Sequence, residues 1–235
     1  MKILAAVLTL TSACFAQTVA TAAGQPAASE AIPAGPEVSF QFERIGLPVP
    51  KFTIVVHEDG TGSYQAQLAA VSAGAGQTST AGPPVNKAIK LSSPTTQTIF
   101  NTAHALDRFN IECESKAKNI ANTGKKTLSY KGADGQGSCL YNYSENKSVA
   151  QLTDTFQAIA FTMDEGRKLE FLHRFDRLGL YSEMDVLSHE VQEKRALELG
   201  NIAPALKAII ADEALMQRVR ERAAHLLAES EEVSR

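Results

Sequence analysis

The sequence predicts an α+β protein. We expect an antiparallel sheet of two hairpin units, in the order β-β-β-α-β-β-α, with helices on one face and a small all-helical C-terminal segment after it. Three observations support this. Apolar and polar residues alternate in short segments of the first half. Gly- and Asp-rich turns join these segments in pairs. From about residue 180 onward only helical periodicity is present.

The composition is that of a globular protein. Of the 235 residues, 44% are hydrophobic and 21% are charged, and the formal net charge is -3. A nucleic-acid-binding protein normally has a basic surplus or a basic stripe, so the weak acidity argues against that class. The absence of Trp leaves few stacking platforms for bases or sugars.

The N-terminus predicts a secretory signal peptide over residues 1–22. Lys2 provides the positive start, and residues 3–10 form an apolar run that is too short to span a bilayer. Small residues follow, and cleavage is expected after Ala16 or Ala22. A lipoprotein signal is disfavoured because Thr11 stands where Leu would precede a lipidated cysteine.

Residues 23–37 are Ala, Pro, Gly and small polar residues, which predict a disordered linker. No other apolar run approaches membrane length, so we expect no stable membrane insertion after the signal is removed. The expected location is bacterial and exported, in the periplasm or outside the cell.

The cysteines predict one disulfide. If Cys14 leaves with the signal, only Cys113 and Cys139 remain, and two cysteines in an oxidising compartment most simply pair. The bridge would close a loop of 26 positions, which stabilises the fold by about 3 kcal/mol or slightly more. A reactive thiol pair is disfavoured because the spacing is unlike Cys-x-x-Cys.

Three strands are expected in the first part of the domain that we assign to residues 38–178. Residues 38–44 alternate apolar and polar positions, residues 52–56 form a second strand, and residues 63–68 alternate again. The pair Asp59-Gly60 predicts the hairpin turn between the last two, because Gly accepts a positive φ. Residues 69–86 are predicted to be a flexible loop.

The second part of this domain should hold a helix, a hairpin and a long helix. Ser93 as N-cap and Pro94 at the first helical position predict the first helix. A second hairpin should turn within residues 131–137, and Ser148 should open the long helix, which Gly166 could bend or interrupt. Its expected apolar stripe consists of Val149, Leu152, Phe156, Ile159, Ala160 and Met163, and Leu169, Leu172 and Phe175 should continue the pattern.

Residues 179–229 are predicted to be helical, and residues 230–235 to be a disordered tail. Ser182 should cap a helix that ends near Gly200, a short helix should cover residues 203–211, and Asp212 should cap the last helix. The apolar face of that last helix consists of Leu215, Val219, Ala223 and Leu226.

Two parts of the sequence resemble known kinds of protein domain. The "V-R-x-R-A-A-x-L-L" pattern after a short helix resembles a single HEAT-type hairpin over about residues 200–229, without the further copies that a solenoid needs. The order of a D-G hairpin, a Ser/Pro-capped helix, a second hairpin and a closing helix over residues 38–178 is similar to an uncharacterised class of exported bacterial domains. That resemblance implies no activity.

Motifs for catalysis, metals and cofactors are not recognisable. The glycines of residues 132–137 do not match a dinucleotide fingerprint, and no G-x-S-x-G elbow is present. Glu170 with His173, and His104 with Asp107, are two-residue clusters that fall short of a metal site. Residues 57–59 (His-Glu-Asp) lie at a hairpin tip, where a solvated turn is expected. We therefore expect no cofactor and no metal.

These observations predict a non-enzymatic binding or structural module of the cell envelope. Its expected partner is another envelope protein, and the expected partner face is the charged side of the last helix, with Arg218, Glu221 and Arg222. The alternative is a hydrolase-type enzyme whose catalytic residues are scattered along the chain.

Overall fold

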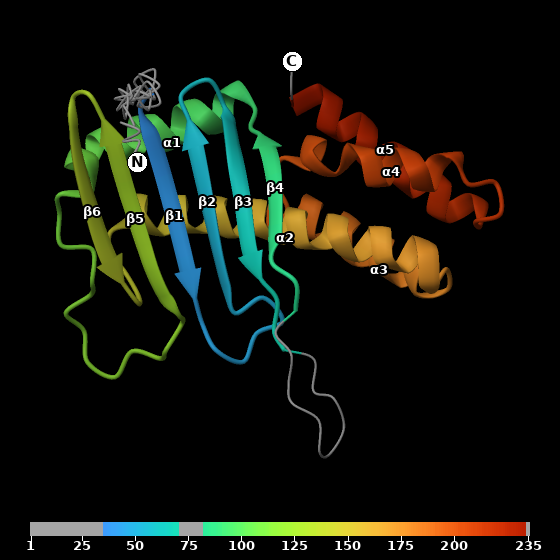
Figure 1. Cartoon of the computed structure of the whole chain (residues 1–235), viewed down its shortest axis with the longest axis horizontal. Coiled ribbons are helices and arrows are strands. Elements are labelled where there is room, and N and C mark those ends of the chain that lie inside the picture. Colours follow the sequence, from blue (N-terminus) through green and yellow to red (C-terminus); the bar gives the residue numbers. More distant parts are fainter. Residues whose placement is uncertain (1–34, 71–81, 234–235) are drawn as a thin grey trace, which may run out of the picture. The chain divides into compact units, whose positions relative to one another are not determined.

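A computed structural model of the chain describes residues 35–70 and 82–233. The predicted signal peptide and most of the predicted linker lie outside these residues. Within them, six strands form one antiparallel sheet in the order β4-β3-β2-β1-β5-β6 (Figure 1). The strands are β1 (Glu37–Glu43), β2 (Lys51–His57), β3 (Thr61–Gln67), β4 (Val85–Lys90), β5 (Lys125–Gly132) and β6 (Gly135–Tyr141).

The predicted α+β class is confirmed, with one strand more than expected. β4 pairs with β3 from Val85↔Ala66 to Lys90↔Thr61, in a region that we expected to be loop at its start and left unassigned after it. Its alternation is weak because Ile89 is the only buried residue of the strand. The order in the structure is therefore β-β-β-β-α-β-β-α before the helical segment.

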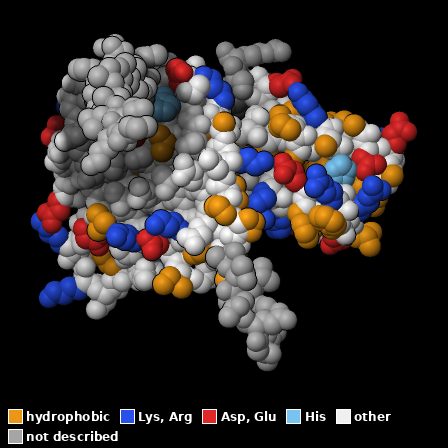
Figure 2. Space-filling model, in the orientation of Figure 1, with side chains coloured by type: hydrophobic (Ala, Val, Ile, Leu, Met, Phe, Trp, Pro, Cys, Tyr) orange, Lys and Arg blue, Asp and Glu red, His pale blue; other side chains and the backbone are white. Residues whose placement is uncertain are grey.

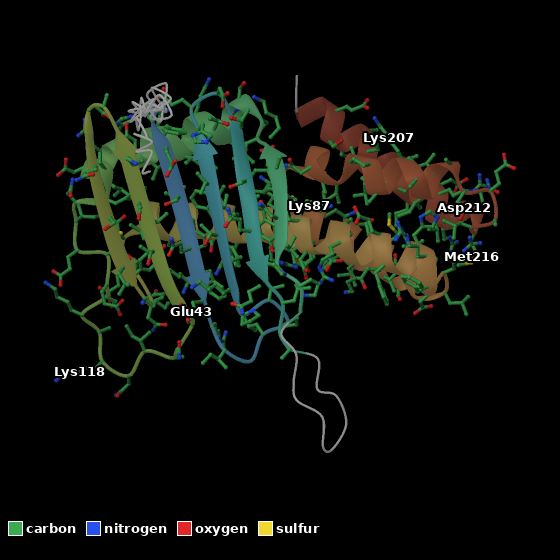
Figure 3. All side chains as sticks on the ribbon, in the orientation of Figure 1. Glu43, Lys87, Lys118, Lys207, Asp212 and Met216 are labelled. Atoms are coloured by element: carbon green, nitrogen blue, oxygen red, sulfur yellow. A yellow bond between two sulfur atoms is a disulfide. The ribbon has the colours of Figure 1, made fainter. Side chains whose placement is uncertain are left out.

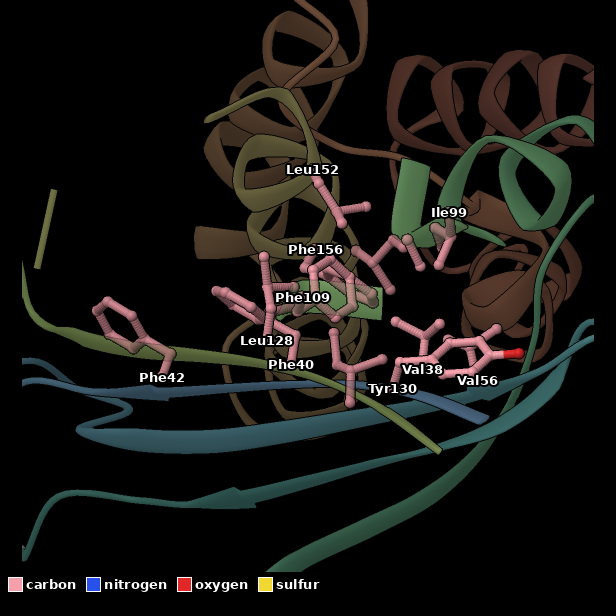
Figure 4. Close-up of a cluster of buried hydrophobic side chains, with 14 of the residues drawn as sticks. Val38, Phe40, Phe42, Val56, Ile99, Phe109, Leu128, Tyr130, Leu152 and Phe156 are labelled. Atoms are coloured by element: carbon pink, nitrogen blue, oxygen red, sulfur yellow. The ribbon is translucent and has the colours of Figure 1, made fainter. Parts of the chain in front are cut away.

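One face of the sheet forms the core and the opposite face is polar. Val38, Phe40 and Phe42 of β1 are buried as their alternation predicts, while Ser39 and Gln41 lie on the other face. Helices α1 (Ser93–Ala105) and α2 (Lys147–Phe175) cover the apolar face (Figures 1 and 4). The ring of Phe40 stacks on Phe156 of α2, with centroids 5.1 Å apart.

The disulfide prediction is confirmed. Cys113 and Cys139 are bonded and buried, and their Cα atoms are 5.7 Å apart. Cys139 lies in β6 on the same face as the buried Tyr141. The bridge therefore ties the irregular segment after α1 to the edge of the core.

Both helices of the domain begin one residue earlier than the sequence indicates. Ser92, and not Ser93, is the N-cap of α1. Asn146 is the N-cap of α2, and its side chain accepts hydrogen bonds from the N–H groups of Ser148 and Val149. The stripe predicted for α2 is buried from Val149 to Leu169, whereas Phe175, which we expected to continue it, is 71% exposed. Gly166 does not interrupt the helix, which runs for 29 residues.

The C-terminal segment has its own core. It consists of α3 (Gly179–Gln192), the 3-10 helix η2 (Leu199–Ile202), α4 (Ala203–Ala211) and α5 (Gln217–Val233). The end of α2 contributes Leu169 to this second core. The stripe predicted for the last helix is buried here, as Leu215, Val219, Ala223 and Leu226.

Three boundaries in this segment differ from the predictions. α3 begins at Gly179 and ends at Gln192, so Ser182 is not its cap and the helix stops well before Gly200. Lys194 and Glu198 adopt positive φ values of 57° and 60° in the connection that follows. Asp212 ends α4 and does not cap α5, which begins at Gln217 and continues past residue 229 to Val233.

Side chains just before and within η2 join the helical segment to the sheet domain. The carboxylate of Glu198 accepts hydrogen bonds from Ser92, at 2.8 Å from its N–H and 2.7 Å from its hydroxyl. Asn201 forms a pair of hydrogen bonds with the backbone of Lys90 in β4. Among the described residues, no helix is both long enough and apolar enough to cross a membrane.

Candidate functional site

The candidate site is a polar groove between α3 and α5. Each helix contributes four side chains at the spacing i, i+3, i+4, i+7, which places them on one helical face. We call this feature the α3–α5 groove. It has a volume of about 470 Å³ and is lined by Asp185, Ser188, His189, Gln192, Arg218, Glu221, Arg222 and His225.

The groove includes all three residues of the predicted partner face. Val219 and Ala223 of α5 are almost fully buried, so the helix is held with Arg218, Glu221 and Arg222 on another side. The facing side of α3 was not predicted from the sequence. Its residues Asp185, Ser188, His189 and Gln192 line the same groove only because the two helices pack side by side.

Arg222 is held in place at the floor of the groove by two contacts with α3. Its Nη1 lies 2.6 Å from Oδ1 of Asp185, and its guanidinium carbon lies 5.6 Å from the ring centroid of Tyr181. An arginine that is both paired and stacked on an aromatic face has little freedom to reorient. Arg222 therefore connects α5 to α3 and forms the floor of the groove.

Arg218 is the more available cation. Its Nη1 donates a hydrogen bond to the hydroxyl of Tyr181 at 3.2 Å, and the side chain is otherwise exposed. This hydrogen bond raises the pKa of Arg218 above its ordinary value. The contact with Tyr181 uses only one N–H group of the Arg218 guanidinium. The other N–H groups can bind a carboxylate, whose geometry matches the planar guanidinium. Arg218 is thus oriented to contact a bound group.

The groove combines both signs of charge. Two arginines stand against Asp185 and Glu221, so the formal sum is zero with His189 and His225 neutral. Glu221 accepts a hydrogen bond from the amide of Gln217 at 2.7 Å. Arg218 can donate hydrogen bonds in this groove, and the carboxylate of Glu221 can accept them.

The two-residue clusters noted in the sequence have other partners. Nε2 of His173 lies 3.0 Å from Oδ2 of Asp212, and Arg177 lies 3.2 Å from the same oxygen. The hydrogen bond from His173 lowers the pKa of Asp212, assisted by the N–H of Ala214. These contacts hold the end of α2 against the connection between α4 and α5.

His104 also has a different neighbour from the one expected. Its Nδ1 lies 3.7 Å from Asp134, whose carboxylate accepts hydrogen bonds from the Tyr130 hydroxyl at 2.6 Å and from Arg108. Burial is the main cause that raises the pKa of Tyr130 to about 12. Because both oxygens of Asp134 are already occupied, this cluster is built to hold the β5–β6 turn.

The turn after α1 explains two glycines of the second hairpin. Asp107, Arg108 and Phe109 form a short left-handed turn with φ values of 49°, 56° and 67°. A Cβ atom at Gly135 would lie 2.9 Å from Arg108 Cδ, and one at Gly137 would lie 2.6 Å from Asn110 Oδ1. The glycines predicted as turn residues thus also make room for this left-handed segment.

Three buried ionisable residues, Lys126, Glu165 and Glu183, had no sequence signal. Lys126 is buried, and its ammonium donates to the carbonyl of Asn142 at 2.7 Å and to the hydroxyl of Thr123 at 2.9 Å. Burial lowers its pKa. Glu165 of α2 and Glu183 of α3 are buried next to each other, and Lys168 lies 2.5 Å from Glu183. Both features join neighbouring elements.

The hairpin tip at residues 57–59 is a turn, as expected. Asp59 accepts hydrogen bonds from the N–H and the hydroxyl of Thr61, which lower its pKa. Among residues 35–70 and 82–233, no group of three or more His, Cys, Asp or Glu side chains is placed to hold a metal ion.

No protein-family model matches this chain, and no curated protein has significant sequence similarity to it. The α3–α5 groove is therefore the feature of the molecule from which a function is inferred.

Proposed function

We propose that the protein is an exported, non-enzymatic binding module that binds another protein of the bacterial cell envelope through the α3–α5 groove. One observation carries this proposal: two helices turn complete polar faces toward a shared groove, in which Tyr181 orients Arg218. The apolar side of α5 is used for its own core, so its charged side is the part available to a partner.

The chemistry of the groove limits the partner segment. A carboxylate would form a charge-assisted hydrogen bond with Arg218, and a lysine or a backbone N–H would satisfy Glu221. A segment with both groups about one helical turn apart would meet both, because Arg218 and Glu221 are themselves three residues apart on α5. We expect a mixed-charge helix or an extended polar segment.

The proposed export and the proposed resemblance to a HEAT-type hairpin are supported by features outside the groove. The signal-like residues 1–22 favour export, and a buried Cys113–Cys139 disulfide is typical of proteins from oxidising compartments. The pair of α4 and α5 agrees with the proposed likeness to a single HEAT-type hairpin, a unit that commonly binds proteins. These points support the proposal without naming the partner.

The experiment is affinity capture from the cell envelope with a matched pair of charge reversals. We would compare the wild-type chain with Arg218→Glu and with Lys207→Glu, which reverses an exposed cation of α4 away from the groove (Figure 3). The captured partner is then purified and its affinity for each form is measured. We expect Arg218→Glu to weaken binding by about tenfold or more, since charged hydrogen bonds are worth roughly that factor.

Lys207→Glu should bind as the wild type does. Binding by Arg218→Glu that equals wild-type binding, with the fold intact by circular dichroism, would show that the groove is not the interface. Failure to capture any partner with the wild-type chain would overturn the proposal as a whole.

A further inference from the structure

Three large apolar side chains are exposed at the C-terminal end of α2 and in the turn that follows it. Phe171, Phe175 and Leu178 have exposed fractions of 57%, 71% and 83%. The rings of Phe171 and Phe175 are in contact, with centroids 5.1 Å apart. We call these residues the apolar end face. Figure 2 shows hydrophobic side chains at this end of the helical segment, with basic and acidic side chains beside them.

The residues of the apolar end face do not belong to the second hydrophobic core. Leu169, two positions before Phe171, is fully buried in that core, and Leu172 packs against it. The end of α2 thus has one apolar side that packs into the second core and another apolar side that is exposed to solvent. Contiguous exposed apolar patches mark interaction surfaces, whereas single exposed apolar side chains are ordinary.

The charge around the apolar end face is arranged with the cations outward. Four residues between 167 and 178 are Arg or Lys, and three of them are paired with a carboxylate: Arg167 with Asp164, Lys168 with Glu183 and Arg177 with Asp212. In the ion pairs here the cation is the more exposed partner. Arg177 is 53% exposed against 20% for Asp212, and Lys168 is 43% exposed against 11% for Glu183.

Arg174 adds a further cation on the same side of the helix. It lies three residues after Phe171 and one before Phe175, and it is exposed. A partner that approaches along the apolar end face would therefore meet aromatic rings first and guanidinium groups around them.

We propose that the apolar end face binds the surface of an anionic lipid bilayer. Aromatic and leucine side chains enter the boundary between headgroups and acyl chains, while arginines contact lipid phosphates. An apolar patch surrounded by outward cations fits this occupant better than it fits a second copy of the chain, because two such surfaces would bring like charges together. The inference goes beyond the proposed function and does not depend on the α3–α5 groove.

The test is sedimentation of the full-length chain with vesicles. One set of vesicles is phosphatidylcholine alone, and the other is an equimolar mixture with phosphatidylglycerol. The variant Phe171→Ser/Phe175→Ser removes the aromatic pair. The control Ile45→Ser/Leu140→Ser removes two exposed apolar side chains from the sheet domain, where they are 94% and 55% exposed. All three forms retain the same N-terminal residues.

We expect the wild type and the control to bind anionic vesicles and to bind neutral vesicles weakly. The aromatic variant should bind anionic vesicles at least about tenfold more weakly, since burial of one such side chain accounts for roughly that factor. Arg174→Glu should also weaken this binding, whereas Lys118→Glu, on a loop of the sheet domain, should not (Figure 3).

Equal binding by all three forms would assign any lipid affinity to another part of the chain and overturn the proposal. Failure of the wild type to bind anionic vesicles would do the same. A wild type that is dimeric by sedimentation equilibrium, with a monomeric aromatic variant, would instead make the apolar end face a self-association surface. Loss of a protein partner from the α3–α5 groove would leave these vesicle results unchanged, so the two proposals fail separately.

Discussion

Gly166 of α2 lies directly against Ile202 of η2. A Cβ atom built at Gly166 would fall well inside the van der Waals radius of the Ile202 side chain, and both residues are buried. Glycine therefore allows η2 to approach the middle of α2, at the point where the helix passes from the sheet core to the second core. A residue that weakens the helix locally is what lets the helical segment dock.

This contact predicts that Gly166→Ala destabilises the protein, although alanine is the better helix former. The helical gain is about 1 kcal/mol, whereas overpacking a closed core costs about 1–3 kcal/mol. We expect a net loss of about 1 kcal/mol in the free energy of unfolding, measured with urea. In the double variant Gly166→Ala/Ile202→Ala the two losses should be less than additive. A more stable Gly166→Ala protein would contradict the contact.

The buried pair of Glu165 and Glu183 predicts a dependence of stability on pH. Burial, and then the hydrogen bond and negative charge of Glu183, raise the pKa of Glu165 from 4.5 to about 8. The folded protein therefore holds this proton where the unfolded chain has lost it. The stabilisation is fully present below pH 4.5 and is lost as pH rises toward 8, at up to about 1.4 kcal/mol per pH unit.

Glu165→Gln should remove most of this decline, because the amide keeps the shape of the protonated acid and carries no charge. The measurement is the free energy of unfolding at pH 5 and at pH 8 for both proteins. Glu170→Gln changes an exposed carboxylate of the same helix and should follow the wild type. A variant with the same decline as the wild type would remove Glu165 as its cause.

The disulfide should contribute most of its stability through the unfolded chain. Cys113 and Cys139 close a loop of 26 positions, and loop-closure entropy gives about 3.5 kcal/mol for that length. We expect Cys113→Ala/Cys139→Ala to lose about 2–4 kcal/mol of unfolding free energy while retaining its secondary structure. Reducing agent should lower the stability of the wild type by a similar amount and leave the variant unchanged.

Alanine substitutions at Gly137 and Gly200 should change stability by different amounts, because only Gly137 lies against the left-handed turn at Arg108. Gly137→Ala would force a Cβ atom against the backbone of Arg108 and the amide of Asn110, so we expect a loss of about 2 kcal/mol or more. Gly200→Ala adds its methyl group in open space and should be nearly neutral. Thermal unfolding of the two variants makes the comparison, and similar melting temperatures would argue against the close approach at Gly137.

Local patterns determined the elements of this fold well. The alternation of apolar and polar residues predicted a strand from Val38 and correctly predicted that its even-numbered residues are buried, because one face of the strand packs against the core. Helical periodicity identified the buried stripe of α2 and that of α5. The missed strand β4 shows where such patterns fail: an edge strand with one buried residue, Ile89, has almost no alternation to detect.

Helix ends and functional surfaces were decided by tertiary structure. Asp212 is a residue type that often caps helices, yet its carboxylate is occupied by His173 of α2 and by Arg177 in the turn after α2, 39 and 35 positions earlier. The sequence indicated the α5 half of the groove, with Arg218, Glu221 and Arg222, since a helix shows its own polar face. Its α3 half became visible only when the packing of α3 against α5 brought the two faces together.

The sequence by itself determined the α+β class, the Cys113–Cys139 pair and the buried stripes, because each depends on the chemistry of residues near one another in the chain or on the lack of another partner. Only the tertiary structure decided the pairing of α3 with α5, the docking of Ile202 on Gly166 and the exposure of Phe171 and Phe175. The physical reason is that an apolar residue at helical spacing can be buried or exposed equally well, and the contacts made by distant segments choose between the two.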